Sequence, residues 1–492
     1  MNELIELNKA MNSNAKLTIL QINDTHGYLE PHSELFWQGD KAEYRTSGGY
    51  ARLLTIFKQV RSERNGAVIA LDNGDTFHGT FHAVHSKGEA FIEPVNLLGL
   101  DAWTVHWDFA YGPERMRELA AKLNHPLLAC NCYVKATGEL AYPAFTVIER
   151  SGVRVGVIGI AATILDKTMP PKFSEGLRFT LGNEELPGHI RTLREQERVA
   201  LVVLLSHLGF PQDVKLASEV TGIDVLLSGH THNRMERPLI VNGATIIQSG
   251  CHGSFVGRLD LELKDGKVLL LRHELIPVND SIPEDAAMQR VVEKIVAPHR
   301  EMLSEVVGHT ETALNRNTML EATMDNLLLQ AIAEAVGTRI AFSNGWRYGA
   351  PIPVGPVTVN DLWNIVPPNP PVSTVELTGQ EMWDMLEENL ERALAADPYQ
   401  QMGGYVKRCL GLRLYVKFEN PSGSRIQQLF VGTEELDRDA AYAVAFVTSQ
   451  GVPKKFGTKR RDLTIHVIDA LKQYMTKHPT VNASLRGTVV AV

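Results

Sequence analysis

The stretch LTILQINDTHG, residues 17–27, sets the architecture of this chain. The segment LTILQIN (17–23) is an apolar run of strand length, and Asp24 and His26 follow directly at its end. This pattern predicts a buried strand of an α/β sheet with polar side chains at its carboxyl end. Open α/β sheets bind their ligands at that edge.

Other apolar runs of the first half end in the same way. Each is of strand length and leads into an acid or a histidine: AVIAL (67–71) into Asp75, ALVVLLSH (200–207) into His207, and DVLLSGH (224–230) into His230 and His232. Because parallel strands bring their carboxyl ends to one edge, we expect these side chains to gather there. Mixed imidazole and carboxylate ligation suits Mn, Zn, Fe or Co better than Ca or Mg. The sequence therefore predicts a site for two divalent transition-metal ions.

The order of strand and helix patterns predicts two α/β domains. The first domain is expected over residues 15–281; it includes a helix at 49–64 and ends with a hairpin at 257–275 around an Asp-Gly turn. Residues 282–304 predict a linker helix that is kinked near Pro298.

The second domain is expected over residues 305–492. It includes a helix at 325–337, a strand at 339–345 and a helix at 379–395.

Composition excludes several classes of protein. The chain of 492 residues has 49 basic and 57 acidic side chains, and its net charge of -8 argues against a duplex nucleic-acid binder. The run VALVVLL (199–205) is too short to cross a bilayer, and Glu3 and Glu6 stand where a signal peptide would be basic. We expect a cytoplasmic protein with a small anionic substrate, no membrane partner and four reduced, buried cysteines. The oligomeric state stays open.

The metal-ligand clusters resemble those of the calcineurin-like metallophosphoesterases, and more narrowly the 5'-nucleotidase family, from about residue 17 to the end. The resemblance implies an αββα sandwich followed by a linker helix and a second α/β substrate domain. It also implies hydrolysis of a small anionic ester, such as the phosphomonoester of a nucleotide in nucleotide catabolism, by attack of a metal-bridging hydroxide. The implied ligands are Asp24, His26, Asp75 and His232 at one metal, and Asp75, His207 and His230 at the other.

The segment DAWTVHWDFAYG (101–112) departs from the family pattern Gly-Asn-His-Glu. By position, His106 replaces the ligand Asn, and imidazole is the stronger donor to a transition metal. Trp107 replaces the catalytic His and cannot carry a proton, so we expect an indole N–H donor or a wall of the pocket. Asp108 completes the candidate catalytic pair, more as a support than as an acid.

The C-terminal half also departs from the family. The loop FSNGWRYG (342–349) keeps Arg347, whose planar guanidinium can bind two oxygens of an anion. Of the two aromatic residues that sandwich a nucleobase in the family, one is replaced by Pro368 and only Phe456 remains as a candidate. The predicted substrate-binding residues are Asn326, Asn344, Arg347 and Phe456, and Asn326 fits equally well as a helix cap.

Two alternatives stay open beside the phosphomonoester hydrolase. The order His-Trp-acid-Phe and the segment SGCHGSFVGRLDLEL (249–263) resemble the sulfur-oxidation thiosulfohydrolase branch, which implies removal of sulfate from a thiol conjugate. In this segment His252 is either a turn residue or part of the pocket. The other alternative is a binding protein that keeps the metals without turnover.

Overall fold

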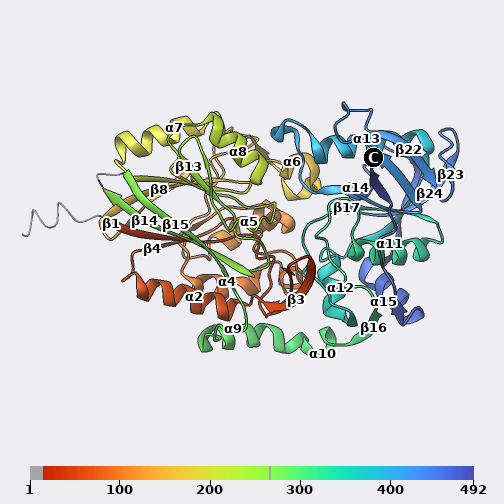
Figure 1. Ribbon diagram of the computed structural model, residues 1–492, viewed down its shortest axis with the longest axis horizontal. Helices are drawn as coiled ribbons and strands as arrows, with labels where there is room; N and C mark the ends of the chain where they lie inside the picture. Colours follow the sequence, from red (N-terminus) through yellow and green to blue (C-terminus); the bar gives the residue numbers. More distant parts are fainter. Residues whose placement is uncertain (1–14, 265–266) are drawn as a thin grey trace, which may run out of the picture.

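The computed structural model describes residues 15–264 and 267–492, and its first half contains two stacked β-sheets (Figure 1). The strand orders are β15-β14-β1-β4-β5 and β12-β13-β11-β10-β8-β7. The strands of the first sheet are β1 (Ala15–Ile22), β4 (Val68–Asp72), β5 (Ala102–Trp103), β14 (Phe255–Lys264) and β15 (Lys267–Pro277). Those of the second are β7 (Phe145–Arg150), β8 (Val153–Ile160), β10 (Leu201–Ser206), β11 (Val225–Leu227), β12 (Leu239–Val241) and β13 (Ala244–Ile247).

Both faces of the central strands are buried, which is why their sequences are continuous apolar runs. Leu17 and Ile19 of β1 pack in one hydrophobic cluster with Leu201 and Val203 of β10, so these side chains fill the space between the two sheets. The alternate residues of each strand point the other way, and Leu20 packs in a cluster with helical residues. Alternate side chains of one strand therefore pack in two different layers: one set between the two sheets, and the other set against the helices.

Helices cover the outer face of each sheet. Helices α2 (Tyr50–Glu63), α4 (Ile92–Leu98) and α9 (Ala286–Val296) contact one another on the first sheet's side of the sandwich, and α7 (Leu186–Arg191) and α8 (Phe210–Glu219) lie on the opposite side (Figure 1). The resulting layers are α, β, β and α. The predicted fold class is confirmed for this half.

The segment predicted as a linker contains α9 and a second, shorter helix. After α9 a short 3₁₀ turn, Ala297–His299, contains Pro298 and leads into α10 (Arg300–Leu303). Proline cannot donate the backbone hydrogen bond that a continuous helix needs, which explains the break. Helices α9 and α10 run along one side of the molecule beneath both halves (Figure 1).

A second α/β unit follows, and its main sheet has the order β20-β17-β24-β19-β25. These strands are β17 (Ile340–Gly345), β19 (Pro371–Thr378), β20 (Tyr405–Leu410), β24 (Ala441–Val447) and β25 (Thr458–His466). Helix α11 (Thr323–Val336) shares a cluster with Ala341 on one face of the sheet, and α13 (Gly379–Leu394) shares another with Ile340 and Phe342 on the opposite face. Where strands pair among the described residues, no pair crosses from one half to the other.

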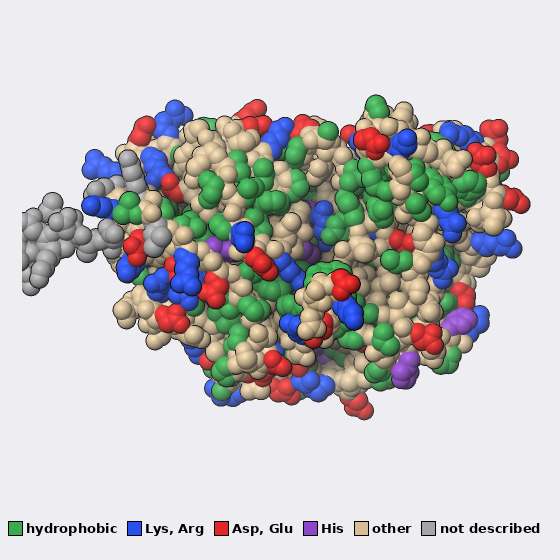
Figure 2. Space-filling model, in the orientation of Figure 1, with side chains coloured by type: hydrophobic (Ala, Val, Ile, Leu, Met, Phe, Trp, Pro, Cys, Tyr) green, Lys and Arg blue, Asp and Glu red, His purple; other side chains and the backbone are tan. Residues whose placement is uncertain are grey.

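The remaining expectations about the chain have mixed outcomes. The strands of the predicted hairpin are present, but the turn residues 265–266 and the N-terminal residues 1–14 lie outside the described part. All four cysteines are free and buried, as predicted. Within the described ranges, no helix has the length and apolar character needed to cross a membrane. Acidic and basic side chains are interspersed over both halves on the face shown in Figure 2.

Removal of side-chain volume between the two sheets should destabilise the first half. Ile19 is fully buried in that layer, so Ile19→Ala should lower the free energy of unfolding by about 2–5 kcal/mol. Ile240, 59% exposed at the end of the second sheet, is the matched control, and Ile240→Ala should change it by less than about 0.5 kcal/mol. Urea unfolding followed by circular dichroism measures both; equal losses would contradict the assigned layer.

Candidate metal centre

The seven predicted ligands lie in loops at the carboxyl ends of strands from both sheets. Strands β1, β4 and β5 are parallel to one another, and so are β8, β10, β11 and β13. Five ligand residues have left-handed backbone conformations: Asp24 (φ 51°), His26 (48°), Asp75 (57°), His230 (71°) and His232 (59°). Such conformations are unfavourable for non-glycine residues and concentrate at functional sites. Because the strands are parallel, these loops lie at one end of the sandwich, and the chain turns sharply at the ligand residues.

The side chains form two adjacent groups. One contains Asp75, His106, His207 and His230, and the other contains Asp24, His26 and His232; within each group the candidate ligand atoms lie within 4.8 Å of one another. Asp75 reaches both groups, because its Oδ2 is 3.2 Å from His106 Nδ1, 3.4 Å from His207 Nε2 and 4.0 Å from His26 Nε2. All seven residues predicted from the sequence are therefore brought together, with Asp75 between the groups.

Unpartnered buried atoms show that this donor set fits cations. Asp24 Oδ1 and His207 Nε2 are buried without a hydrogen-bond partner. The other ring nitrogen of His207, Nδ1, lies 2.5 Å from the carbonyl oxygen of Asn73, which orients Nε2 toward the carboxylates. Leaving such atoms buried and unsatisfied is unfavourable, and bound divalent cations would satisfy them.

The electrostatics of the donor set favour positive charge. Burial opposes ionisation of Asp75, but His106 and His207 hold the pKa of its carboxyl well below the usual value. Burial likewise opposes charge on His207, yet Asp75 and Asp24 raise its pKa to about 10. Burial holds the pKa values of His26 and His230 well below the ordinary value, so these imidazoles are neutral, the form that ligates a metal. The residues present therefore fit a bound metal ion.

Asp108 supports the metal loops, in agreement with the expectation of a support, and a catalytic role for it stays a prediction. Its buried carboxylate accepts hydrogen bonds from the backbone N–H groups of Asp75 (2.9 Å), Thr76 (2.8 Å), Phe77 (2.9 Å) and His106 (3.2 Å). Burial and the nearby charge of Asp75 raise the pKa of Asp108. With its oxygens committed to backbone donors, Asp108 positions Asp75 and His106.

Asn73 is a supporting residue that the sequence analysis missed. Its side-chain amide donates to the carbonyl oxygens of Ser206 (2.8 Å) and Leu227 (2.7 Å), at the ends of β10 and β11, and its Oδ1 accepts from Gln21 (2.7 Å). This residue therefore ties the edge of one sheet to the edge of the other directly beneath the ligands. The segment LDNGD contained it, but no spacing rule marks an amide that bridges two sheets.

Trp107 forms a wall of the cavity beside the metal groups. Its indole stacks on His78 with ring centroids 4.6 Å apart, and its backbone N–H donates to Asp75 Oδ1 at 2.6 Å. His78, a second residue missed from the sequence, is buried and has no hydrogen-bond partner at either ring nitrogen. The position agrees with the expectation of a wall, whereas an indole N–H donor and a catalytic function of Trp107 stay predictions.

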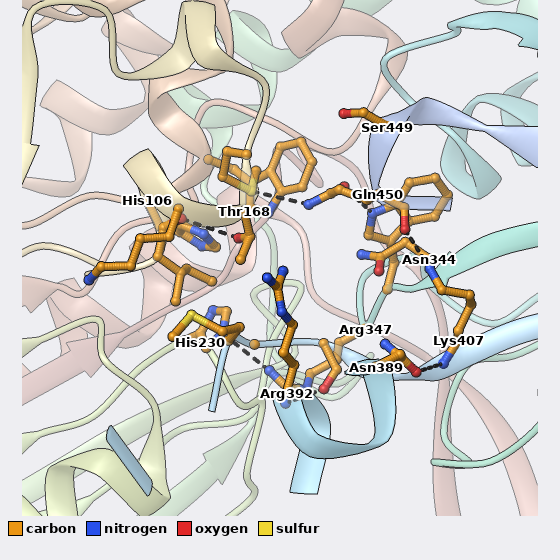
Figure 3. A pocket seen from close by; sticks show the side chains of 18 of the residues that line it. His106, Thr168, His230, Asn344, Arg347, Asn389, Arg392, Lys407, Ser449 and Gln450 are labelled. Atoms are coloured by element: carbon orange, nitrogen blue, oxygen red, sulfur yellow. Dashed lines mark hydrogen bonds between the residues drawn. The ribbon is translucent and has the colours of Figure 1, made fainter. Parts of the chain in front are cut away.

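A cavity of about 320 Å³ separates the metal groups from the second half (Figure 3). Asn344 and Arg347 line it, and their contact with a substrate stays a prediction. Arg347 reaches across the cavity: its guanidinium lies 3.2 Å from His230 Nε2 and donates to the carbonyl oxygen of Gly404 at 3.1 Å. The adjacent Gly403 has φ 71°, and a Cβ there would lie 2.9 Å from His230 Nε2. The backbone of the second half thus approaches the metal groups closely.

Two predicted substrate-binding residues lie elsewhere. Asn326 is buried, and its amide donates to Glu321 and to the carbonyl oxygens of Ala483 and Ser484, so it joins segments of the second half. Phe456 packs against the hydrophobic core that contains α13. Neither lines the cavity. The prediction for Asn326 is corrected, because its amide is already used inside the second half. A substrate contact by Phe456 stays a prediction.

His252 belongs to a third group, with His32 and Glu34, that could hold a cation by geometry alone. The carboxylate of this group is already satisfied: Glu34 accepts from Arg234 (2.7 Å) and Ser254 (3.0 Å), and lies 3.1 Å from His252 Nδ1. The backbone N–H of His252 donates to the carbonyl oxygen of Asp24 at 2.7 Å. We therefore assign this group to support of the Asp24 loop.

The chain resembles known proteins along most of its length. Residues 306–449 match the family described as 5'-nucleotidase, C-terminal domain. A 5'-nucleotidase from Vibrio cholerae is 25% identical over 87% of this chain and 83% of that protein, and protein UshA from Escherichia coli is 24% identical over 96% and 92%.

Two solved structures are similar over nearly the whole chain. Sulfate thiohydrolase SoxB from Thermus thermophilus, in complex with glycerol, has a TM-score of 0.90 at 25% identity and covers 97% of this chain and 96% of that chain. A 5'-nucleotidase precursor, also from Thermus thermophilus, has a TM-score of 0.85 at 24% identity, with 97% and 99% coverage. The predicted resemblance to 5'-nucleotidases and the predicted two-part fold are confirmed.

Loss of Asp75 should remove bound metal. Because Asp75 belongs to one group and lies 4.0 Å from His26 of the other, Asp75→Ala should lower the metal content from about two ions per chain to one or none. Asp397, an acid on the surface paired with Lys215, is the control, and Asp397→Ala should keep the wild-type content. Elemental analysis of protein purified with Mn measures the ratio; unchanged content in Asp75→Ala would refute the shared carboxylate.

Proposed function

We propose that this protein is a metal-dependent hydrolase of small anionic esters, with a phosphomonoester such as a nucleotide as the first candidate substrate. The observation that carries this proposal is the position of Asp75 between two groups of ligands that face Arg347 across a cavity. The prediction of a phosphoester hydrolase is confirmed at the level of enzyme class by the named 5'-nucleotidase relatives. The substrate and the identity and number of the metal ions belong to the proposal.

The residues that would hold the cations belong to the two groups of side chains. Asp24, His26 and His232 would hold one cation, His106, His207 and His230 the other, and Asp75 both. When bound, two such cations supply a hydroxide nucleophile at neutral pH and stabilise the charge that develops on the substrate. Asp108 and Asn73 keep the ligand loops in place, which reduces the reorganisation needed when the substrate binds.

Arg347 would bind and orient the anionic group. A guanidinium offers a planar pair of donors that matches two oxygens of a phosphate or sulfonate. Arg347 is half-buried beside His230, so an anion held by it would lie next to the metal groups. Trp107 closes the same region and keeps water from one side of the cavity.

A second candidate reaction is removal of sulfate from a thiol conjugate. Trp107 has no titratable group, so it cannot protonate a leaving group as an imidazole can. A thiol, with a pKa of about 8.5, leaves as an anion far more readily than an alcohol does. The high structural similarity to a sulfate thiohydrolase supports the same candidate.

A substrate panel separates these reactions. We expect metal-loaded protein to hydrolyse nucleoside monophosphates or S-sulfonated thiols, and chelation to abolish the activity because both groups of ligands then lose their cations. Release of phosphate or sulfate is measured for nucleoside monophosphates, cyclic nucleotides and S-sulfonated thiols. Full turnover without metal would refute the proposed mechanism, and absence of turnover with every substrate would favour a metal-retaining binding protein.

Removal of the guanidinium should weaken turnover. Arg347→Met is expected to lower kcat/KM by about 10–100-fold, since a hydrogen bond to a charged group contributes roughly 1.5–3 kcal/mol. Arg339 is exposed just before the same strand, so Arg339→Met is the control and should leave kcat/KM within about two-fold. Steady-state kinetics on the best substrate of the panel measures both; equal effects would exclude a specific contact by Arg347.

A further inference from the structure

Lys407 is a buried cation in the wall of the cavity, and the metal site does not account for it. It lies on β20 with 3% of its surface exposed. Its Nζ donates to the carbonyl oxygens of Gln450 (2.7 Å) and Gly451 (2.8 Å). An ammonium group has three donors, so these two contacts leave one donor for another acceptor.

Lys407 lacks a carboxylate partner. Across residues 15–264 and 267–492, no carboxylate oxygen lies within 4.0 Å of its Nζ. The nearby Glu388 is paired with Arg392 at 2.8 Å and also with Lys455. Burial and Arg392 lower the pKa of Lys407 to about 7, with Glu388 acting in the opposite direction. A buried cation without a paired anion is unfavourable, and an anionic ligand would relieve that cost.

The surroundings of Lys407 suit an anionic group. Asn389 and Arg392 of α13 line the same cavity, and Lys454 lies at its edge. Figure 3 shows His106 and His230 on one side, Lys407 and Asn389 on the other, and Arg347 and Arg392 between them. Glu388 also lines this end, and its carboxylate is paired with Arg392 and Lys455, so Lys407 is the cation there without a paired carboxylate.

The same wall does not offer a place for a nucleobase between two aromatic rings. Phe456 packs in the core of the second half and does not line the cavity. Trp346 and Tyr348 do line it, but each is 3% exposed and the two rings stack on each other with centroids 5.8 Å apart. Their ring faces are thus already covered.

We propose that Lys407, Asn389 and Arg392 form a second anion-binding subsite, which selects substrates that carry a carboxylate besides the ester group bound at the metal end. This inference rests on the proposed function for the position of the ester. It narrows the substrate class toward small molecules with two anionic ends and away from nucleosides with a single phosphate.

Matched pairs of non-hydrolysable phosphonates test the subsite by binding alone. The pairs are phosphonoacetate and ethylphosphonate, 3-phosphonopropionate and propylphosphonate, and 4-phosphonobutyrate and butylphosphonate. Calorimetric titration of full-length protein loaded with Mn and freed of unbound metal should show at least one carboxylate member binding about ten-fold more tightly than its alkyl partner.

Variants test which residues cause the preference for the carboxylate member of each pair. Lys407→Met should reduce the preference to about two-fold or less while the alkylphosphonate affinity stays unchanged. Lys455→Met is the matched control: Lys455 also pairs with Glu388 but does not line the cavity, so the preference should persist. The thermal unfolding midpoint reports whether Lys407→Met is folded. If it is not, Arg392→Met, a change on the exposed rim, should lower the preference part of the way.

Two results would overturn the inference. One is a wild-type protein that binds every carboxylate member no more than about two-fold better than its alkyl partner. The other is a preference that persists in folded Lys407→Met, or in Arg392→Met where that variant replaces it. Because phosphonates are bound without being cleaved, these outcomes are independent of the turnover panel, and failure of the proposed hydrolase activity would appear there instead.

Discussion

The carboxylate of Asp75 is the centre on which the rest of this site depends. Its Oδ2 faces three imidazoles from three different loops, and its Oδ1 accepts the backbone N–H of Trp107. A buried carboxylate needs opposite charge and hydrogen-bond donors, and here both are drawn from segments far apart in the chain. Asp108 holds the backbone of the same loop through hydrogen bonds, while the carboxylate of Asp75 faces imidazoles on its other side.

That arrangement requires two sheets whose parallel strands end at one place. Asn73 joins the ends of β4, β10 and β11 through its side-chain amide, which connects the two sheets at the level of the ligands. The left-handed conformations of five ligand residues are the local cost of aiming their side chains at a common point. The sandwich supplies a rigid base for these loops, because its central strands are buried on both faces.

In the proposed function, substrate choice depends on the other side of the cavity. The first half brings metal ligands and Trp107, a residue that cannot transfer a proton, and the second half brings Arg347, Lys407 and Asn389. A leaving group that needs no protonation and a substrate with a second anionic end would both suit this combination. In this proposal, the first half holds the metal ions and the second half selects the substrate.

Local sequence patterns were enough to predict the main strands and helices and six of the candidate ligands, because apolar periodicity and the residues at strand ends can be read without the fold. The seventh candidate, His106, followed from its position in a family motif. The same kind of reasoning misplaced Asn326, because its position in a motif did not reveal that its amide is used inside the second half. That Lys407, Asn389 and Gln450 share one wall with Arg347 became visible in the folded chain alone. Those residues come from different strands and helices, and the packing of separate elements, which no local pattern encodes, brings them together.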